Sequence, residues 1–324
     1  MTTSVFADRP FFIVGAGRSG TTLLRLMLSG HSRLHVSPET WFLQPLLARF
    51  PVAEALGPQE RHAAIGLIVG HYRWPDLRVD ERVLRAEIED RGADTLRELT
   101  DAVYACVARQ AGKARVGDKT PTYVRILPQL AALYPDAQFI HLLRDGRDVA
   151  LSYIDAGWEL RCYQGDRFEW TEAVRAAHVF GAKAAAGTWI DVRYEDLVHA
   201  PERVLRDLCA FLGEAFEPAM MNAASRADLV PERERKIHPR VGGAIDAGRA
   251  GAWQSRLSPL ELLVLEACLG QDLRACGYAL SNDGAARRAL LALSRAALNS
   301  TGPFLMRAIP ALQRRGIISP RALL

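Results

Sequence analysis

FFIVGAGRSGTT, residues 11–22, is a run of apolar residues that ends in a glycine-rich turn. A continuous apolar run of this kind is typical of a strand buried in the middle of a parallel sheet. A helix is predicted over residues 19–30, because apolar residues from Leu23 to Leu28 share one face. A glycine loop between a strand and a helix offers backbone N–H groups and the positive end of the helix dipole. The stretch therefore predicts a site for a phosphate-like group.

The loop departs from the usual nucleotide-phosphate loop. Such a loop closes with Gly-Lys-Ser or Gly-Lys-Thr, whereas this one closes with Gly20, Thr21 and Thr22 and carries its cation early, at Arg18. Without the lysine, a kinase or ATPase lacks its usual cation at the β- and γ-phosphates. A P-loop kinase or NTPase stays an alternative, which magnesium-dependent turnover of ATP would support. A plain strand–helix connection is the other reading of a glycine-rich turn.

Further strands and helices alternate along the chain. Strands are predicted at 34–40, 116–121, 138–145 and 189–197, and helices at 122–134, from about 145, and at 201–213. This alternation predicts a P-loop-like three-layer α/β fold with a central parallel sheet flanked by helices. Residues 41–112 are mostly helical by periodicity and are interpreted as an insertion, whereas 225–252 are interpreted as a long functional loop.

A second motif is HLLRDGRDVALSY, residues 141–153. Arg144 ends a predicted buried strand, at the edge where open α/β sheets bind their ligands. Ser152 lies two turns into the next helix, so both side chains can face one site. An arginine with a hydroxyl suits a terminal phosphate monoester. A salt-bridged helix start is the alternative for this motif taken alone.

The chain length of 324 residues permits one large α/β domain or two small ones. We interpret residues 1–283 as a single domain that carries the helical insertion at about 41–112. Residues 284–324 hold seven arginines and no acidic residue and are interpreted as a helical extension. Packing of this extension on the domain is favoured over contact with an anionic membrane, because its leucines are sparse and prolines interrupt the apolar face.

Charge and cysteine content limit the function classes. A net charge of +4 suits an anionic ligand or a slightly basic surface and is too small to indicate a nucleic-acid binder. The five cysteines are scattered without metal-ligand spacing, which indicates reduced thiols and predicts no metal site. The first residues lack the pattern of a signal peptide, and no apolar run approaches the roughly 20 residues of a spanning helix. These features predict a cytoplasmic protein.

Four stretches together resemble the sulfotransferases that use 3′-phosphoadenosine 5′-phosphosulfate (PAPS). GAGRSGTT resembles their 5′-phosphosulfate loop, and RDGRDVALS resembles their 3′-phosphate motif. VRYEDLVHAPERVLRDLCAFLG is similar to the segment where a tyrosine reaches the adenine, and GRAGAWQSRLSP to the late loop that closes over the nucleotide. The resemblance runs from about Phe11 to Pro259. It implies transfer of a sulfuryl group from PAPS to a hydroxyl or amine, with 3′,5′-adenosine bisphosphate (PAP) as product and no metal.

The resemblance is strongest to the branch that holds tyrosylprotein and many bacterial sulfotransferases. That branch shares RSGTTLLR, a Glu-Thr pair and a Lys-x-Pro stretch, found here at Glu39 and Lys119. The resemblance implies that Glu39 is the general base, and a dry pocket would raise its pKa. Arg18 and Lys119 are implied to stabilise the bridging oxygen and the sulfate oxygens. A capping or salt-bridged carboxylate is the alternative for Glu39.

The same resemblance implies a set of cofactor contacts. They are Gly17, Arg18, Ser19, Gly20, Thr21, Thr22, Arg144, Ser152, Tyr194 and Arg249. Tyr194 could instead be an ordinary core aromatic. The late loop has Asp246 and Ala247 where the family has an Arg-Lys pair, so Arg249 or Arg240 is expected to replace that contact.

The acceptor and the oligomeric state cannot be read from the sequence. A small molecule, a glycan or a lipid headgroup is favoured over a protein tyrosine or a nucleic acid. Contact of the 284–324 extension with a membrane would favour a lipid acceptor. Residues 155–170 are predicted to form a gate after the 3′-phosphate helix. A protein that binds the nucleotide without catalysis is a further alternative.

Overall fold

Five strands form one sheet in which every neighbouring pair is parallel. The computed structural model describes residues 9–157, 168–237, 243 and 245–281. The strands are β1 (Phe11–Gly15), β2 (Leu34–Ser37), β3 (Arg115–Lys119), β4 (Gln138–Leu143) and β5 (Trp189–Arg193), in the order β2-β3-β1-β4-β5. The chain leaves β1 toward β3 and β2 and later returns past it to β4, so the order of strands reverses at β1. Ligands of open parallel sheets bind at this point, beyond the carboxyl ends of the strands.

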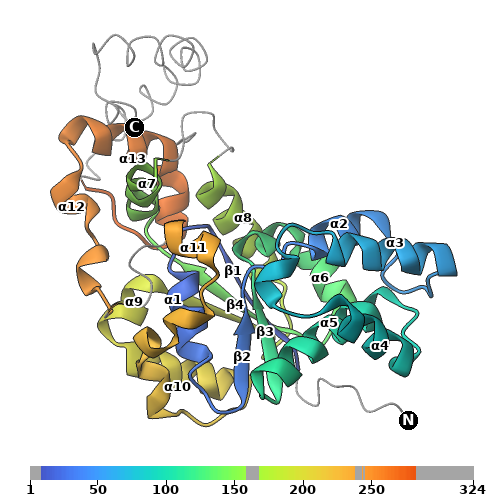
Figure 1. The fold of residues 1–324 in the computed structure, drawn as a ribbon. Coiled ribbons are helices and arrows are strands. Elements are labelled where there is room, and N and C mark those ends of the chain that lie inside the picture. The colour runs from blue at the N-terminus through green and yellow to red at the C-terminus, as the bar shows by residue number, and fades with distance from the viewer. Residues whose placement is uncertain (1–8, 158–167, 238–242, 244, 282–324) are drawn as a thin grey trace.

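Helices cover both faces of the sheet, and the predicted three-layer α/β fold is confirmed (Figure 1). The longer helices are α1 (Thr21–Leu28), α3 (Pro58–Val69), α4 (Glu81–Arg91), α5 (Leu96–Ala111), α7 (Gly146–Asp155), α8 (Glu169–Gly181), α10 (Pro201–Leu212) and α13 (Pro259–Ala275). Shorter ones are α2 (Leu43–Arg49), α6 (Leu127–Leu133), α9 (Tyr194–His199), α11 (Glu232–Ile237) and α12 (Trp253–Arg256). The 3₁₀ turns are η1 (Trp74–Leu77), η2 (Pro121–Ile126), η4 (Pro218–Met221), η5 (Ala223–Leu229) and η6 (Ala247–Arg249).

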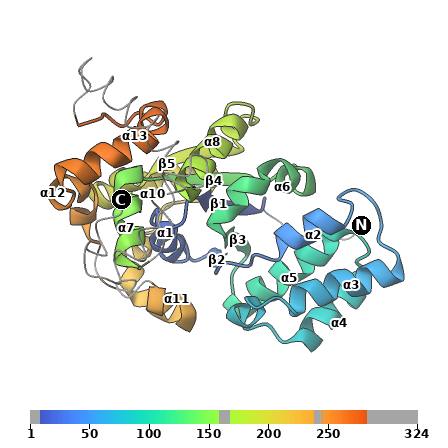
Figure 2. The same ribbon diagram turned by 90° about the horizontal axis from the view of Figure 1, so that it is seen from above.

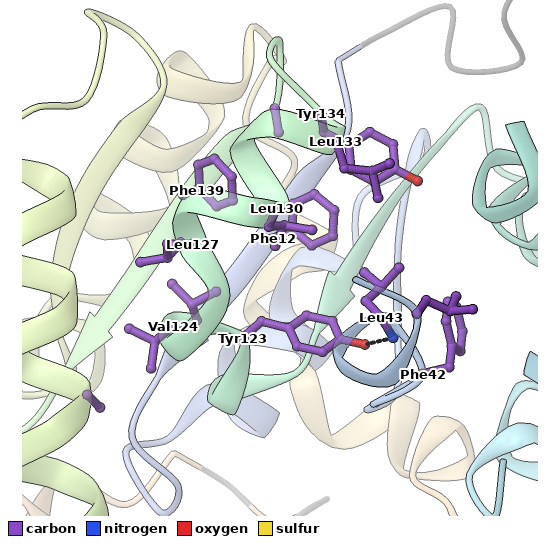
Figure 3. Close-up of a cluster of buried hydrophobic side chains, with 14 of the residues drawn as sticks. Phe12, Phe42, Leu43, Tyr123, Val124, Leu127, Leu130, Leu133, Tyr134 and Phe139 are labelled. Carbon is purple, nitrogen blue, oxygen red and sulfur yellow. Dashed lines mark hydrogen bonds between the residues drawn. The ribbon is translucent and has the colours of Figure 1, made fainter. Parts of the chain in front are cut away.

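Alternate residues of β1 enter two separate cores. Phe12 belongs to the core on one face, with α5, α6 and α8, whereas Phe11 and Ile13 belong to the other, with α1 and α10. A strand with both faces buried must be apolar at every position, which explains the continuous run in the sequence. Figure 3 shows Phe12 and Phe139 stacked on one side of the sheet, together with Tyr123, whose hydroxyl accepts from the Leu43 N–H.

Residues 41–112 form α2, α3, η1, α4 and α5, which lie together beside the β2 and β3 edge (Figures 1 and 2). Helix α5 begins with a capping box in which Thr95 accepts from the Glu98 N–H and Glu98 accepts from the Thr95 N–H. Its buried face packs next to β2 and β3. The expected helical character of this stretch is confirmed, and its turns bring Arg73 close to the ends of β2 and β3.

Three predicted elements differ from the structure. The helix predicted at 122–134 is divided into η2 and α6, because Pro128 has no N–H to donate to the carbonyl of Val124. The strand predicted at 189–197 ends at Arg193, and α9 begins with acidic residues in its first turn, where the helix dipole favours them.

The third difference is the loop predicted at 225–252. Within it lie the end of η5 together with α11 and η6, and α11 begins after Pro231. The extension at 284–324, Arg240 and residues 158–167 of the predicted gate lie outside the described residues. Across the described ranges, no helix has both the length and the apolar character needed to cross a membrane.

Candidate active site

The loop between β1 and α1 holds two residues in left-handed backbone conformations. Arg18 has φ 65° and Gly20 has φ 94°. A Cβ atom at Gly20 would collide with the ring of Tyr194, which lies directly against the loop. Glycine is therefore required at position 20 by both its backbone conformation and its neighbour. The tight turn leads into the amino end of α1, which has no side-chain cap.

On one side of this loop, Glu39 and Lys119 form an ion pair. Lys119 is the last residue of β3, and Glu39 follows the end of β2, which is the next strand in the sheet. The register, in which Ser37 pairs with Asp118, brings both side chains to the same carboxyl edge. Lys119 Nζ lies 2.9 Å from Glu39 Oε1 and 3.4 Å from the hydroxyl of Thr22 in α1. The two predicted catalytic residues therefore meet beside the loop.

Two residues that the sequence analysis did not identify complete this group. Arg73 donates from one nitrogen, Nη2, to Glu39 at 2.8 Å and to Glu234 at 2.7 Å. Lys119 Nζ also lies 3.4 Å from Glu234. Two carboxylates and two cations thus alternate in a closed ring of Glu39, Lys119, Glu234 and Arg73, which we call the charge ring. No local motif marks either new residue, because Arg73 directly precedes the 3₁₀ turn η1 and Glu234 lies in α11, a short helix without an apolar period.

The pKa of Glu39 is lowered to about 2, contrary to the raised pKa expected from the sequence. Burial is the largest single influence and raises the pKa, but the charges of Lys119 and Arg73 and a hydrogen bond from Trp41 Nε1 at 2.8 Å together outweigh it. The expectation was wrong because it considered burial without Arg73. Glu39 is consequently ionised at neutral pH, as a general base must be.

On the other side of the loop, Arg18 and Ser152 join the two predicted phosphate motifs. Arg18 Nε donates to the Ser152 hydroxyl at 3.0 Å. Arg144 donates from one nitrogen to the Arg18 carbonyl and from another to the Arg249 carbonyl, both at 2.9 Å. Burial and the nearby guanidinium groups of Arg249 and Arg144 lower the pKa of Arg18. We call Arg18, Arg144 and Arg249 the arginine cluster.

Tyr194 lies between the loop and this cluster. The Arg144 guanidinium carbon lies 4.4 Å from the centre of the Tyr194 ring, and the ring covers Gly20. Tyr194 is mostly buried, so in this structure it supports the loop and Arg144. The predicted set at the 3′-phosphate motif is thus brought together in space.

The late loop is held by Asp148, a residue of the RDGRD motif that the sequence analysis did not assign. Its two carboxylate oxygens accept from the N–H groups of Gly251 at 2.7 Å and Trp253 at 2.9 Å. The guanidinium of Arg147 stacks 3.7 Å from the centre of the Trp253 ring. These contacts bring Arg249 to Arg144. The motif itself was the signal, since Asp148 lies in the first turn of α7, four residues after Arg144.

The remaining predicted contacts line the loop. The Gly17 N–H donates to Glu169 at 3.1 Å, so an incoming anion would have to displace that carboxylate to reach this N–H. Thr21 and Thr22 are buried in the first turn of α1. The buried Ser19 hydroxyl and Arg144 Nε have no hydrogen-bond partner. Unpartnered donors beside three guanidinium groups suit an anionic ligand with more than one charged group. In the portion of the chain that the structure describes, no group of side chains has the makeup of a metal site.

These features form a candidate site for an anionic ligand at the switch point of a parallel sheet. The chain belongs to the sulfotransferase family, a family of sulfuryl-transfer enzymes, because the family model matches residues 10–218. The resemblance inferred from the sequence is thereby confirmed. Protein-tyrosine sulfotransferase 2 of Gallus gallus is 25% identical over 217 residues, which are 65% of this chain and 53% of that protein. Nodulation protein NoeE of Sinorhizobium fredii is 28% identical, over 81% of this chain and 64% of that protein.

A solved structure shows the same fold. The sulfotransferase domain of the Synechococcus PCC 7002 olefin synthase superposes with a TM-score of 0.59 and 28% identity, over 84% of this chain and 96% of that domain. The chain spans little more than half of the length of the two protein-tyrosine sulfotransferases of chicken and Danio rerio, 53% and 56%.

Proposed function

We propose that this protein transfers the sulfuryl group of PAPS to an acceptor hydroxyl or amine, with Glu39 as general base. The observation that carries the proposal is the 2.9 Å pair of Glu39 and Lys119 beside Thr22 of the loop. A base and a cation at the amino end of α1 are what an in-line displacement needs. The arginine cluster on the other side of the loop supports a donor that carries a second phosphate.

The reaction requires few groups from the protein. The acceptor oxygen forms a bond to sulfur, the bond from sulfur to the bridging oxygen breaks, and PAP leaves with that electron pair. The acceptor proton passes to a Glu39 carboxylate oxygen. Lys119 stabilises charge on the sulfuryl oxygens, and its move toward them releases Glu39 from one of its two cations. The pKa of Glu39 then rises from its low value, which makes it a better base.

Arg18 is proposed to contact the donor from the side of Ser152. Its hydrogen bond to the Ser152 hydroxyl supports a role at the junction of the 5′ and 3′ phosphates, in addition to the bridging-oxygen role expected from the sequence. Gly17, Ser19, Gly20 and Thr21 are proposed to contact the phosphosulfate through the loop. Tyr194 is proposed to meet the adenine, and Arg249 the 3′-phosphate.

The acceptor is proposed to be a small molecule, a glycan or a lipid headgroup, in a cytoplasmic enzyme of bacterial type. The relative NoeE is named a nodulation protein and the solved domain comes from an olefin synthase, so not all similar proteins carry the name protein-tyrosine sulfotransferase. The names of the protein-tyrosine sulfotransferases keep a tyrosine side chain among the acceptors to be tried.

The first experiment is calorimetric titration with PAP, ADP and 5′-AMP, without magnesium. Binding of PAP at least tenfold tighter than ADP is expected, because only PAP engages both groups of cations. Transfer from ³⁵S-labelled PAPS to a panel of phenols, sugars and lipid headgroups then tests catalysis. Equal binding of all three nucleotides, or magnesium-dependent turnover of ATP, would overturn the proposal.

Glu39→Gln separates catalysis from binding. The variant is expected to bind PAP at least as tightly as the unaltered protein and to lose at least a hundredfold in turnover, the usual order for a general base. Unchanged turnover would rule out Glu39 as the base. Binding of PAP by the unaltered protein without transfer to any acceptor would favour a nucleotide-binding protein without catalysis.

A further inference from the structure

We propose that Glu234 is a positioning residue for sulfuryl transfer. It pairs with Lys119 and Arg73, so that the positive charges of these two residues are shared between Glu234 and Glu39. The inference rests on the proposed function, since it concerns the base and cation of that reaction. It adds a residue from α11, far along the chain from the recognised motifs, to the catalytic site.

The contacts of Glu234 are the first argument. Its Oε1 accepts from Arg73 at 2.7 Å and its Oε2 lies 3.4 Å from Lys119 Nζ. These are the same two cations that contact Glu39, at 2.8 and 2.9 Å. Because each cation lies between the two carboxylates, neither can move toward one without loosening its contact with the other.

Exposure distinguishes the members of the charge ring. The side chains of Lys119, Glu234 and Arg73 are 0%, 2% and 6% exposed, whereas that of Glu39 is 18% exposed. Glu39 is therefore the member of the ring most open to an acceptor. Glu234 is sealed behind it and acts on the reaction only through the two cations.

The groups around the ring leave Glu234 with a specific electrostatic role. Arg73 also contacts Asp76 at 3.2 Å, and Arg233 contacts the same Asp76 at 3.1 Å. Further charged or donor groups that face the ring are Arg25 of α1, Trp41, and Thr22. Within the charge ring, loss of the Glu234 charge would leave two cations, Lys119 and Arg73, facing one carboxylate. Burial of an ion pair contributes little net stability, so a stabilising role alone does not account for this carboxylate.

The consequence for the reaction follows from charge balance. With Glu234 in place, Lys119 can turn toward the sulfuryl oxygens while Arg73 stays shared between two carboxylates. Glu39 then faces only part of one positive charge when it accepts the acceptor proton. With Glu234 neutral, Arg73 pairs with Glu39 alone and the donor site gains one net positive charge. Anions then bind more tightly, and Glu39 becomes a weaker base.

The test is Glu234→Gln, with PAP affinity and turnover of PAPS measured on the same preparation. PAP is expected to bind about fivefold tighter, and kcat to fall about tenfold, with the acid limb of the kcat–pH profile moved to lower pH. Opposite changes in affinity and turnover mark a charge-balancing role. Weaker PAP binding, or an unchanged kcat, would overturn the proposal.

Glu87→Gln is the matched control. Glu87 also binds two cations, Arg91 and Arg109, both at 2.6 Å, but it lies on α4 in the helical insertion. Its variant is expected to lower the melting temperature without changing PAP affinity or kcat. Glu234→Asp keeps the charge and should retain most of the kcat and the PAP affinity of the unaltered protein. If Glu234→Gln does not fold, Glu234→Asp becomes the test. A kcat far below that of the unaltered protein would then contradict the proposal. Absence of turnover in the unaltered protein would instead refute the proposed function.

Discussion

Arg18 Nε donates to the Ser152 hydroxyl at 3.0 Å, across 134 residues of sequence. This hydrogen bond connects the loop after β1 with the helix after β4, the two neighbouring strands at which the sheet order reverses. The two phosphate motifs are thus parts of one surface, with the arginine cluster on one side of the loop and the charge ring on the other. The arrangement suits a ligand with two anionic groups.

Ser152→Ala is expected to weaken PAP binding about fivefold to tenfold, because Arg18 loses the hydroxyl that orients it and the ligand loses a donor. Calorimetric titration with PAP measures the effect. Ser225→Ala, an exposed hydroxyl in η5, is the control and should bind PAP normally. An unchanged affinity of Ser152→Ala for PAP would show that Ser152 does not contribute to the binding site.

Gly20→Ala is expected to cost about 3 kcal/mol in the free energy of unfolding and to abolish PAP binding, because the new Cβ collides with Tyr194 at a left-handed backbone position. Gly112→Ala is the matched control. Gly112 has φ 63° and open space around it, so its substitution should cost only about 1 kcal/mol and leave PAP binding intact. Urea unfolding and titration with PAP compare the two. Equal losses in both would contradict the clash with Tyr194.

Asp148→Asn is expected to release the late loop, since an amide cannot accept from both the Gly251 and Trp253 N–H groups. Trypsin should then cleave after Arg249 about tenfold faster, and PAP should bind more weakly. Asp207→Asn, on the exposed face of α10, is the control. Unchanged cleavage would show that other contacts hold this loop.

His35 makes the stability of the fold depend on pH. Burial, with smaller contributions from Arg25 and Lys113, lowers the pKa of His35 to about 4, below the 6.5 of an ordinary histidine. Between about pH 4 and pH 6.5, the folded state thus binds fewer protons at His35 than the unfolded state does. The contribution of neutral His35 to stability is complete above about pH 6.5 and is lost as the pH falls through about 4.

Urea unfolding at about pH 7 and about pH 5 tests this dependence. His35→Gln is expected to show a smaller loss of stability between the two pH values than the unaltered protein. His62→Gln, at an exposed position in α3, should retain the full loss. An identical pH dependence in all three proteins would rule out His35 as its source.

Local patterns were sufficient for most elements, and long-range contacts explain where they failed. The run at residues 11–15 is apolar because both faces of β1 are buried. The apolar run was therefore enough to predict a central strand of a parallel sheet. The end of β5 was not, because Tyr194 turns into α9, where its ring covers Gly20. Helix α11 was not predicted because its six residues, Glu232–Ile237, are nearly all charged and show no periodic apolar face.

The parallel α/β fold, the family and the position of the loop follow from local sequence alone, because each depends on residues that are neighbours in the chain. It also singled out Glu39 and Lys119 as candidate residues, and the parallel pairing of β2 with β3 brings them together. The electrostatics of the base depend on the folded structure, because Arg73 is 34 residues from Glu39 in the chain and Glu234 of α11 is 161 residues from Arg73. The charge that a carboxylate carries depends on every ion near it in space, and no sequence pattern encodes that sum.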